Sequence, residues 1–191
     1  MKPNEKQSFI IGYIYGFLHN KWYQEKFNVL LMHHYPRVYI YPETSILRKI
    51  SKLGLDLISE HIQISLFHLQ KLQDLKDKPI RIVSSDIYSL KDVSLVTYEY
   101  NQTHQKLSLC YLNNETSVKL QFSISVSSEI WFYQIGSIKI IDHWLKSRKI
   151  NKIERSWTLT EWKELELIVD ICRSSHQIST QISEKIGRAH V

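Results

Sequence analysis

Ten residues in the middle of the chain, from 118 to 127, alternate strictly between apolar and polar side chains. The apolar set is Val118, Leu120, Phe122, Ile124 and Val126, and the polar set is Lys119, Gln121, Ser123, Ser125 and Ser127. Successive side chains of a strand point to opposite faces, so this pattern predicts an antiparallel strand with one buried face and one exposed face. Such a strand needs partners, and the runs 80–83, 93–100 and 106–112 have the composition of strands. Residues 112–116, LNNET, predict a hairpin turn between the last two strands.

Helical periodicity precedes these strands. Ile10, Ile14 and Leu18 belong to an apolar set, completed by Ile11 and Phe17, that predicts the buried face of a helix. Gly12 and Gly16 lie four residues apart, so they share a face and would allow close packing. After a break near residues 19–20 the pattern continues, and HHYPRVYIYP then ends the helix and predicts a short strand over 38–41. A second helix is predicted from 44–45 to about His61, and the polar run 70–78 is the best candidate for a joint between subdomains.

Helical spacing returns after Gly136. Ser137 is expected to cap a helix that continues to about Arg148. Thr158 and Glu161 form a capping-box pattern for a last helix, whose apolar positions are Trp162, Leu165, Ile168, Val169 and Cys172. The order of helices, a small central antiparallel sheet and helices again predicts the α+β class.

Composition excludes several classes of protein. A hydrophobic content of 43% and a charged content of 23% over 191 residues are typical of a folded chain. The two cysteines have no CxxC partner and the nine histidines lack metal-ligand spacing, so we expect no metal site and a reducing, cytoplasmic compartment. The apolar N-terminal run is too short to cross a bilayer, and no cleavage site follows it, so no membrane partner is expected.

The last six residues, IGRAHV at 186–191, resemble the translation of a sequencing-adapter oligonucleotide. We therefore expect the native segment to be 1–185 and the tail 186–191 to be non-native. A non-native tail of this kind carries no information about function.

Positive charge is concentrated in one stretch of the chain. The net charge is +6, and residues 137–157 hold six Lys or Arg residues against two acids, a local excess of four. Concentrated positive charge favours an anionic partner. On the predicted helix, Trp144 falls on the inner side with Arg148, which either caps the helix or forms a salt bridge. Lys139 and Lys146 fall on the outer side, where a merely solvated basic face is the competing interpretation.

Two blocks of sequence resemble one known family. FIIGYIYGFLHNKWYQEKFNVLLMHHYPRV followed by SKLGLDLISEHIQ is similar to the opening of the C-terminal specificity domain of Type ISP restriction–modification enzymes. EIWFYQIGSIKIIDHWLKSRK is similar to the second block of that domain. The chain departs from the family pattern at several positions: Asn20-Lys21 replaces Ser-Pro, Val38-Tyr39 replaces Ile-Pro, and Ser137 replaces the second glycine of Gly-Gly.

The resemblance implies a role in recognising double-stranded DNA for a larger enzyme with nuclease, ATPase and adenine N6-methyltransferase domains. This chain has none of the sequence motifs for S-adenosylmethionine, ATP or nuclease chemistry, so by itself it is not expected to methylate or cleave DNA. S-adenosylmethionine, ATP and magnesium are cofactors expected only for the absent domains. The alternative is a non-catalytic protein-interaction or scaffold domain with a basic surface.

The resemblance also directs the choice of site residues. The residues expected to contact phosphates are Lys139, Lys146, Lys149, Lys152, Arg148 and Arg37. A structural ion pair remains the alternative for Arg37. Base-reading residues are expected on the polar sheet face or in loops, but the sequence singles out none of them.

Overall fold

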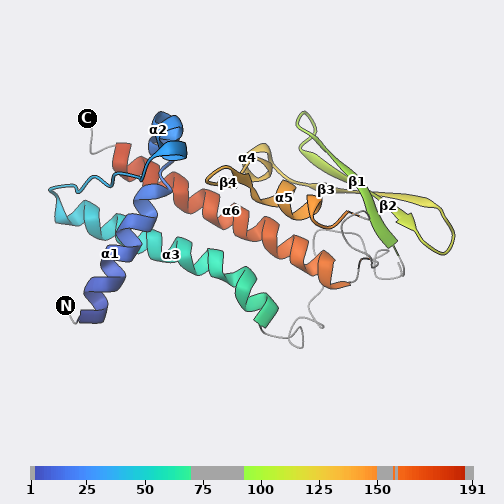
Figure 1. Ribbon diagram of the computed structural model, residues 1–191, viewed down its shortest axis with the longest axis horizontal. Coiled ribbons are helices and arrows are strands. Elements are labelled where there is room, and N and C mark those ends of the chain that lie inside the picture. Colours follow the sequence, from blue (N-terminus) through green and yellow to red (C-terminus); the bar gives the residue numbers. More distant parts are fainter. Residues whose placement is uncertain (1–2, 70–92, 150–156, 158, 188–191) are drawn as a thin grey trace. The chain divides into compact units, whose positions relative to one another are not determined.

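The computed structural model describes residues 3–69, 93–149, 157 and 159–187. Helices come first and last along the chain and the strands lie between them (Figure 1). The predicted α+β class is therefore confirmed. Contacts divide the chain into two compact units, the first from 1–63 with 173–191 and the second from 64–172. Each unit has its own apolar core, and no helix in the described ranges is long and apolar enough to cross a membrane.

The first unit is helical. It contains α1 (Pro3–Leu18), α2 (Lys21–His33), most of α3 (Thr44–Leu69) and the end of α6 (Leu159–Gly187). The helix α3 extends past the predicted end near His61. The buried core residues of the first unit are apolar or aromatic: Tyr13, Phe17, Tyr23, Tyr41, Ile50, Leu57, Ile182 and Ile186. Ile186 thus packs in the core, although it belongs to the stretch predicted to be non-native.

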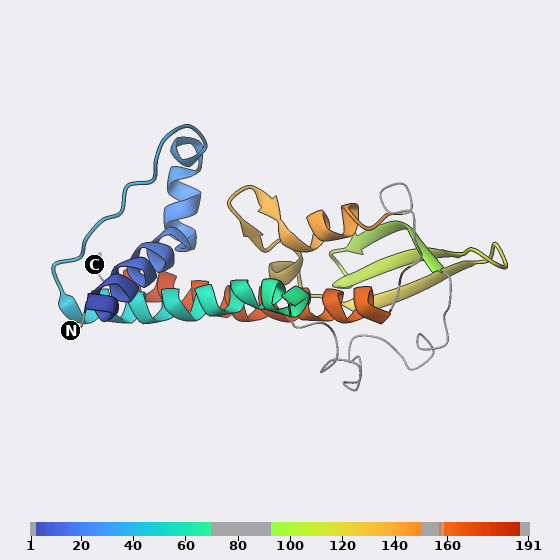
Figure 2. The ribbon, with the colours of Figure 1, turned by 60° about the horizontal axis from the view of Figure 1, so that its bottom comes forward.

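Glycine lets α1 and α3 approach each other very closely (Figure 2). A Cβ at Gly54 of α3 would collide with the backbone oxygen of Gly12, and a Cβ at Gly16 would lie 2.7 Å from the Ile50 carbonyl oxygen. The predicted close-packing face is therefore confirmed. The prediction of the helix's apolar face was partly wrong, because Ile10, Ile11 and Ile14 are 54%, 55% and 40% exposed. Phe17 is buried as predicted, and the rest of the buried face consists of the glycines and Tyr13.

The segment between α2 and α3 does not form the strand predicted over 38–41. It is extended, but tyrosine hydroxyls replace a strand partner. The Tyr23 hydroxyl accepts a hydrogen bond from Arg37 N–H at 3.1 Å and donates one to the Arg37 carbonyl at 2.8 Å. The Tyr13 hydroxyl donates to the carbonyl of Tyr39. Alternation of aromatic and aliphatic residues therefore predicted the extended backbone but not how it is held.

The second unit contains a three-stranded antiparallel sheet. Its strands are β1 (Val93–Asn101), β2 (Lys106–Asn113) and β3 (Lys119–Ser125), in that order, so β1 and β3 are the outer strands. Three predicted strands and the turn are confirmed: the Asn113 side-chain oxygen accepts the N–H groups of Glu115 and Thr116. The predicted strand at 80–83 lies outside the described residues, as do the predicted joint at 70–78 and Thr158 of the capping box.

A short helix and a small hairpin follow the sheet. These are α4 (Ser128–Trp131), β4 (Gln134–Ile135) and β5 (Ile138–Lys139), and α5 (Ile140–Lys146) comes next. The prediction that Ser137 caps α5 was wrong. Ser137 lies in the turn of the hairpin beside Gly136, whose φ is +61°. That backbone conformation favours glycine, and it reverses the chain before the helix begins.

Aromatic rings fill the core of the second unit. Trp157 lies at the centre of the group, with its ring centroid 5.1 Å from Tyr111, 5.2 Å from Trp162 and 5.5 Å from Trp144. All four side chains are at least nine-tenths buried. The core therefore connects the sheet, α5 and the first half of α6, and it fixes α5 beside strand β1.

Candidate functional site

Three of the predicted basic residues gather beside β1 in the second unit. Lys139 ends β5, Lys146 ends α5, and Lys149 pairs with Leu95 through an isolated bridge on β1. Asp142 connects the group to the sheet, because the Tyr98 hydroxyl donates to its carboxylate at 2.8 Å. We call Lys139, Lys146 and Lys149 the lysine cluster.

Asp142 is the carboxylate at the centre of this cluster. Its Oδ2 lies 2.7 Å from the ammonium nitrogen of Lys146, whose side chain is 65% exposed. Partial burial would raise the pKa of Asp142, but the hydrogen bonds from Lys146 and Tyr98 and the charges of Lys146 and Lys139 outweigh burial and lower it. Burial, with Asp142 as a further cause, raises the pKa of Tyr98, so its hydroxyl remains a donor. Three ammonium groups against one carboxylate leave a local charge of about +2.

Aromatic faces hold the other two lysines. The Lys139 ammonium lies 4.9 Å from the ring centroid of Phe132, and the Lys149 ammonium lies 5.0 Å from that of Tyr98. A cation over a ring is attracted by the negative face of the π system, yet it keeps donor groups directed to solvent. The rings therefore position these cations and leave their hydrogen bonds available for an anion.

Arg148 has a different environment. Its guanidinium lies 3.2 Å from the Glu164 carboxylate and 4.9 Å from the centroid of Trp144. The Trp144 indole N–H donates to the same Glu164 oxygen at 2.8 Å, and Glu164 is 4% exposed. Arg148 therefore compensates a buried charge, which is the salt-bridge alternative that the sequence left open.

Two further residues, Lys152 and Arg37, were predicted to contact phosphates. Lys152 lies outside the described residues, and Arg37 belongs to the first unit. In the part of the chain that the structure describes, the Arg37 side chain has no carboxylate partner. The ion-pair alternative for Arg37 thus finds no support there.

The exposed face of the sheet is polar across all three strands. Cross-strand neighbours in register include Glu99, Ser108 and Ser123, with the two serine hydroxyls 3.1 Å apart. Other residues of this face are Thr97, Asn101, Lys106, Cys110, Lys119, Gln121 and Ser125. This is the polar face that alternation along 118–127 predicted, now extended over β1 and β2.

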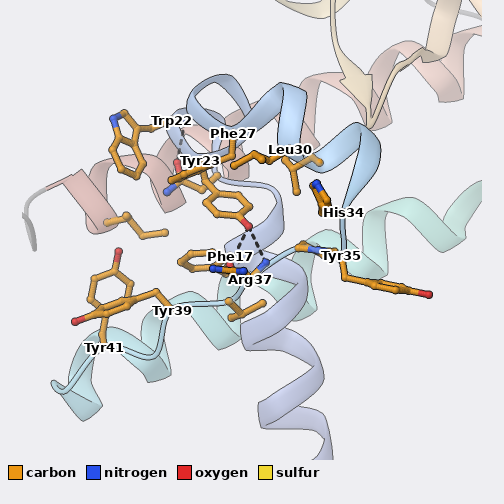
Figure 3. A pocket seen from close by; sticks show the side chains of 15 residues that line it. Phe17, Trp22, Tyr23, Phe27, Leu30, His34, Tyr35, Arg37, Tyr39 and Tyr41 are labelled. Atoms are coloured by element: carbon orange, nitrogen blue, oxygen red, sulfur yellow. Dashed lines mark hydrogen bonds between the residues drawn. The ribbon is translucent and has the colours of Figure 1, made fainter.

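Sequence reasoning missed a pocket in the first unit. The cavity has a volume of about 730 Å³ and lies between α2, the end of α1 and the extended segment 34–41 (Figure 3). Seven of its fifteen lining residues are Phe, Tyr or Trp, and Asn20, His34 and Arg37 add polar nitrogen groups. The frequency of Tyr, Phe and Trp between 17 and 41 was the available signal, but rings spaced along two helices and a loop reveal no cavity until the chain folds.

Among the described residues, no group of three His, Cys, Asp or Glu side chains is placed to bind a metal ion. The arrangement instead offers cations for an anionic surface, polar groups for hydrogen bonding, and an aromatic pocket.

Comparisons with known proteins agree with the resemblance seen in the sequence. The family described as the Type ISP C-terminal specificity domain matches residues 5–172. Among solved structures, a nuclease-deletion mutant of the Type ISP restriction-modification enzyme LlaGI, in complex with a DNA substrate mimic, has a similar fold. Its TM-score is 0.52 at 14% identity, and the match covers 93% of this chain and 13% of that one. No curated protein sequence matches. Because the family match spans most of its length, the chain belongs to the Type ISP C-terminal specificity domain family.

Proposed function

We propose that this chain is the DNA target-recognition segment of a Type ISP restriction–modification enzyme. The observation that carries this proposal is the lysine cluster: three cations, positioned by Phe132, Tyr98 and Asp142, beside the outer strand of a sheet with a polar exposed face. Family membership and the DNA complex of LlaGI support it.

The lysine cluster would supply affinity and register. Ammonium groups neutralise phosphates and release condensed counterions, which makes binding strong at low salt and independent of sequence. Lys139 and Lys149 have no carboxylate within salt-bridge distance among the described residues, so they can contact phosphates directly. Lys146 would exchange Asp142 for a phosphate oxygen. Arg148 would contribute indirectly, by fixing the end of α5 against α6.

The polar sheet face would supply sequence choice. The major groove admits a two-stranded β-ribbon, and serine and glutamine side chains can form hydrogen bonds with base edges. Residues at the ends of the sheet, in the hairpin turns at 102–105 and 114–118, would reach furthest. The side chains Gln121, Ser108 and Ser123 are the central candidates on the face itself.

The chemistry of the whole enzyme would reside elsewhere. The match covers only 13% of the solved enzyme's chain, so methylation of adenine, translocation and cleavage are proposals for other domains. Those domains would bind S-adenosylmethionine, ATP and magnesium, and they would act in the cytoplasm. This chain would hold the duplex while the methyltransferase extracts an adenine from the base stack.

A charge-reversal experiment tests the proposal. We expect Lys139→Glu with Lys146→Glu to weaken binding to every duplex by roughly tenfold or more, because two phosphate contacts become repulsive. Gel-shift titration at fixed low salt measures the affinity, and circular dichroism checks the fold.

The matched control is Lys49→Glu with Lys52→Glu, which makes the same charge change at exposed positions of α3. Equal losses in both double variants would show that binding follows net charge alone. Unchanged affinity in the first variant would remove the lysine cluster from the interface and favour the scaffold alternative.

A further inference from the structure

We propose that the aromatic pocket of the first unit binds a single nucleotide, with the base among the rings and the phosphate at Arg37. The ligand chemistry is a planar heterocycle joined to an anion, and its source is either a free nucleotide or an unstacked nucleotide of a DNA strand. The second source rests on the proposed function. The position of this pocket in the fold is independent of the lysine cluster, which belongs to the other unit.

Aromatic side chains make the walls suitable for a base. Phe17, Tyr23 and Tyr41 line the pocket but are less than a tenth exposed, whereas Tyr39 is 56% exposed and meets Tyr41 edge to face at 5.0 Å. Trp22 is 47% exposed and also lines the pocket, so part of its indole surface remains available to a ligand. Every nucleobase has a π face, and stacking on such rings is a general means of holding an unpaired base.

One buried nitrogen group of a residue that lines the pocket lacks a partner. The Asn20 side chain is fully buried, and its oxygen already accepts from the Trp22 backbone N–H at 3.0 Å and from the Ser183 hydroxyl at 3.2 Å. Its amide nitrogen has no hydrogen-bond partner in the described part of the chain. A buried unsatisfied donor is costly, so this amide favours a ligand that brings an acceptor, such as a ring nitrogen or carbonyl of a base.

The charge of the pocket favours an anion. Arg37 lines it without a carboxylate partner among the described residues, and Figure 3 shows its side chain among the aromatic rings. No Asp or Glu is among the described lining residues, whereas Lys26 lies 4.5 Å from the Trp22 ring centroid. An arginine fork binds phosphate well. An apolar helix of a protein partner would instead cover Arg37 and Asn20 without satisfying either.

The pocket wall is fixed before any ligand arrives. The Tyr23 hydroxyl bridges the N–H and carbonyl of Arg37, and the Tyr13 hydroxyl holds the carbonyl of Tyr39. Burial raises the pKa of Tyr13 to about 12, so this hydroxyl stays a donor at neutral pH. The segment that carries Arg37 is thereby held against α1 and α2, which reduces the entropy lost on binding.

Trp22 is a built-in probe for the test. The other four tryptophans are at least nine-tenths buried in the second unit, so the Trp22 indole N–H resonance reports on the pocket. The 191-residue chain is titrated with deoxyadenosine monophosphate, with deoxyadenosine, and with a single-stranded and a duplex oligonucleotide. The variant Trp22→Phe assigns the resonance.

We expect the monophosphate to shift the Trp22 resonance saturably, and the nucleoside to bind at least tenfold more weakly. Arg37→Ala should weaken binding of the monophosphate about tenfold or more and leave the affinity for the nucleoside unchanged. The control Arg48→Ala removes an exposed arginine of the same unit that does not line the pocket, and it should change neither.

The remaining outcomes distinguish a free nucleotide from a nucleotide of DNA as the ligand. They also distinguish failure of the pocket proposal from failure of the proposed function. Tighter binding of the single strand than of the monophosphate identifies DNA as the source, and the reverse order identifies a free nucleotide. A Trp22 resonance that no nucleotide moves, or equal losses in Arg37→Ala and Arg48→Ala, overturns the pocket proposal. Duplex affinity lost through Lys139 and Lys146 would still support the proposed function in that case.

Discussion

Trp144 illustrates how one side chain can combine packing with charge compensation. Its ring is buried against Trp157, its N–H donates to the buried carboxylate of Glu164, and its face carries the Arg148 guanidinium. A buried carboxylate needs both a hydrogen bond and a counter-charge to remain ionised at low cost. Trp144 supplies the first and orients the second.

We predict that Trp144→Ala lowers the free energy of unfolding by about 3–5 kcal/mol, because it leaves a cavity and removes a hydrogen bond from Glu164. Thermal and urea unfolding measure the loss. Trp22→Ala, which truncates a half-exposed tryptophan of the other unit, is the control and should cost clearly less. An unchanged melting temperature for Trp144→Ala would show that its ring does not stabilise the fold.

The burial of single residues could be predicted from the sequence where it follows from the periodicity of one helix. Trp144 was predicted to lie inside and is 8% exposed. The supports of the lysines could not be predicted, because Phe132 and Tyr98 come from a different turn and a different strand. Cation–ring contacts of that kind depend on tertiary packing and leave no spacing pattern.

The crossing of α1 and α3 is the element-scale feature that depends most on sequence detail. Gly12, Gly16 and Gly54 bring the two backbones into direct contact. Glycine normally weakens a helix relative to alanine by about 0.5–1 kcal/mol, through the entropy of the unfolded chain. Here that cost accompanies a close approach which no larger residue would permit.

For Gly54→Ala, helix propensity and packing predict opposite signs. We expect packing to dominate and the variant to lose about 1–3 kcal/mol of stability, because the new methyl group meets backbone atoms of Gly12 and Gly16. Chemical denaturation gives the sign. Ser59→Ala, at an exposed position of the same helix, should change stability by less than about 0.5 kcal/mol. If Gly54→Ala were more stable than the unaltered chain, α1 and α3 could move apart without loss of unfolding free energy.

Elements were predictable where local pattern and tertiary role agreed. The strands β1, β2 and β3 each carry their own alternation, and one face of each is buried. The run 38–41 has strand composition too, but the tyrosine hydroxyls take the place of a paired strand. The start of α5 was misplaced because Gly136-Ser137 can begin a helix or turn a hairpin, and only the pairing of β4 with β5 decides.

At the scale of the whole molecule, the two units have different surfaces. The second unit holds the lysine cluster and the polar sheet face. The first holds the aromatic pocket and, among the residues that the structure describes, most of the large hydrophobic side chains that are exposed. Sequence order predicted helices, sheet and helices. It did not predict that α6 contributes to both units, because the apolar stripe of a long helix does not reveal which core each turn enters.

Salt dependence is the property of the whole chain that best reports on its anionic partner. We predict that the logarithm of the duplex affinity falls linearly with the logarithm of salt concentration, with a slope that becomes less negative by about 2 in the Lys139→Glu and Lys146→Glu variant. Fluorescence anisotropy over a range of salt concentrations measures both slopes. A slope near zero for the unaltered chain would mean that phosphates are not neutralised on binding.

Asp142 has a consequence that reaches beyond the local geometry. A carboxylate among lysines limits how tightly this surface can bind arbitrary duplex, since a phosphate at Lys146 must displace it and its charge repels phosphates at the other two lysines. A genome contains vastly more non-target sites than target sites, so a protein that dissociates slowly from each non-target site would rarely reach its target. If the proposed function is right, Asp142 shortens the residence time of the protein on non-target DNA and so speeds the search for the target.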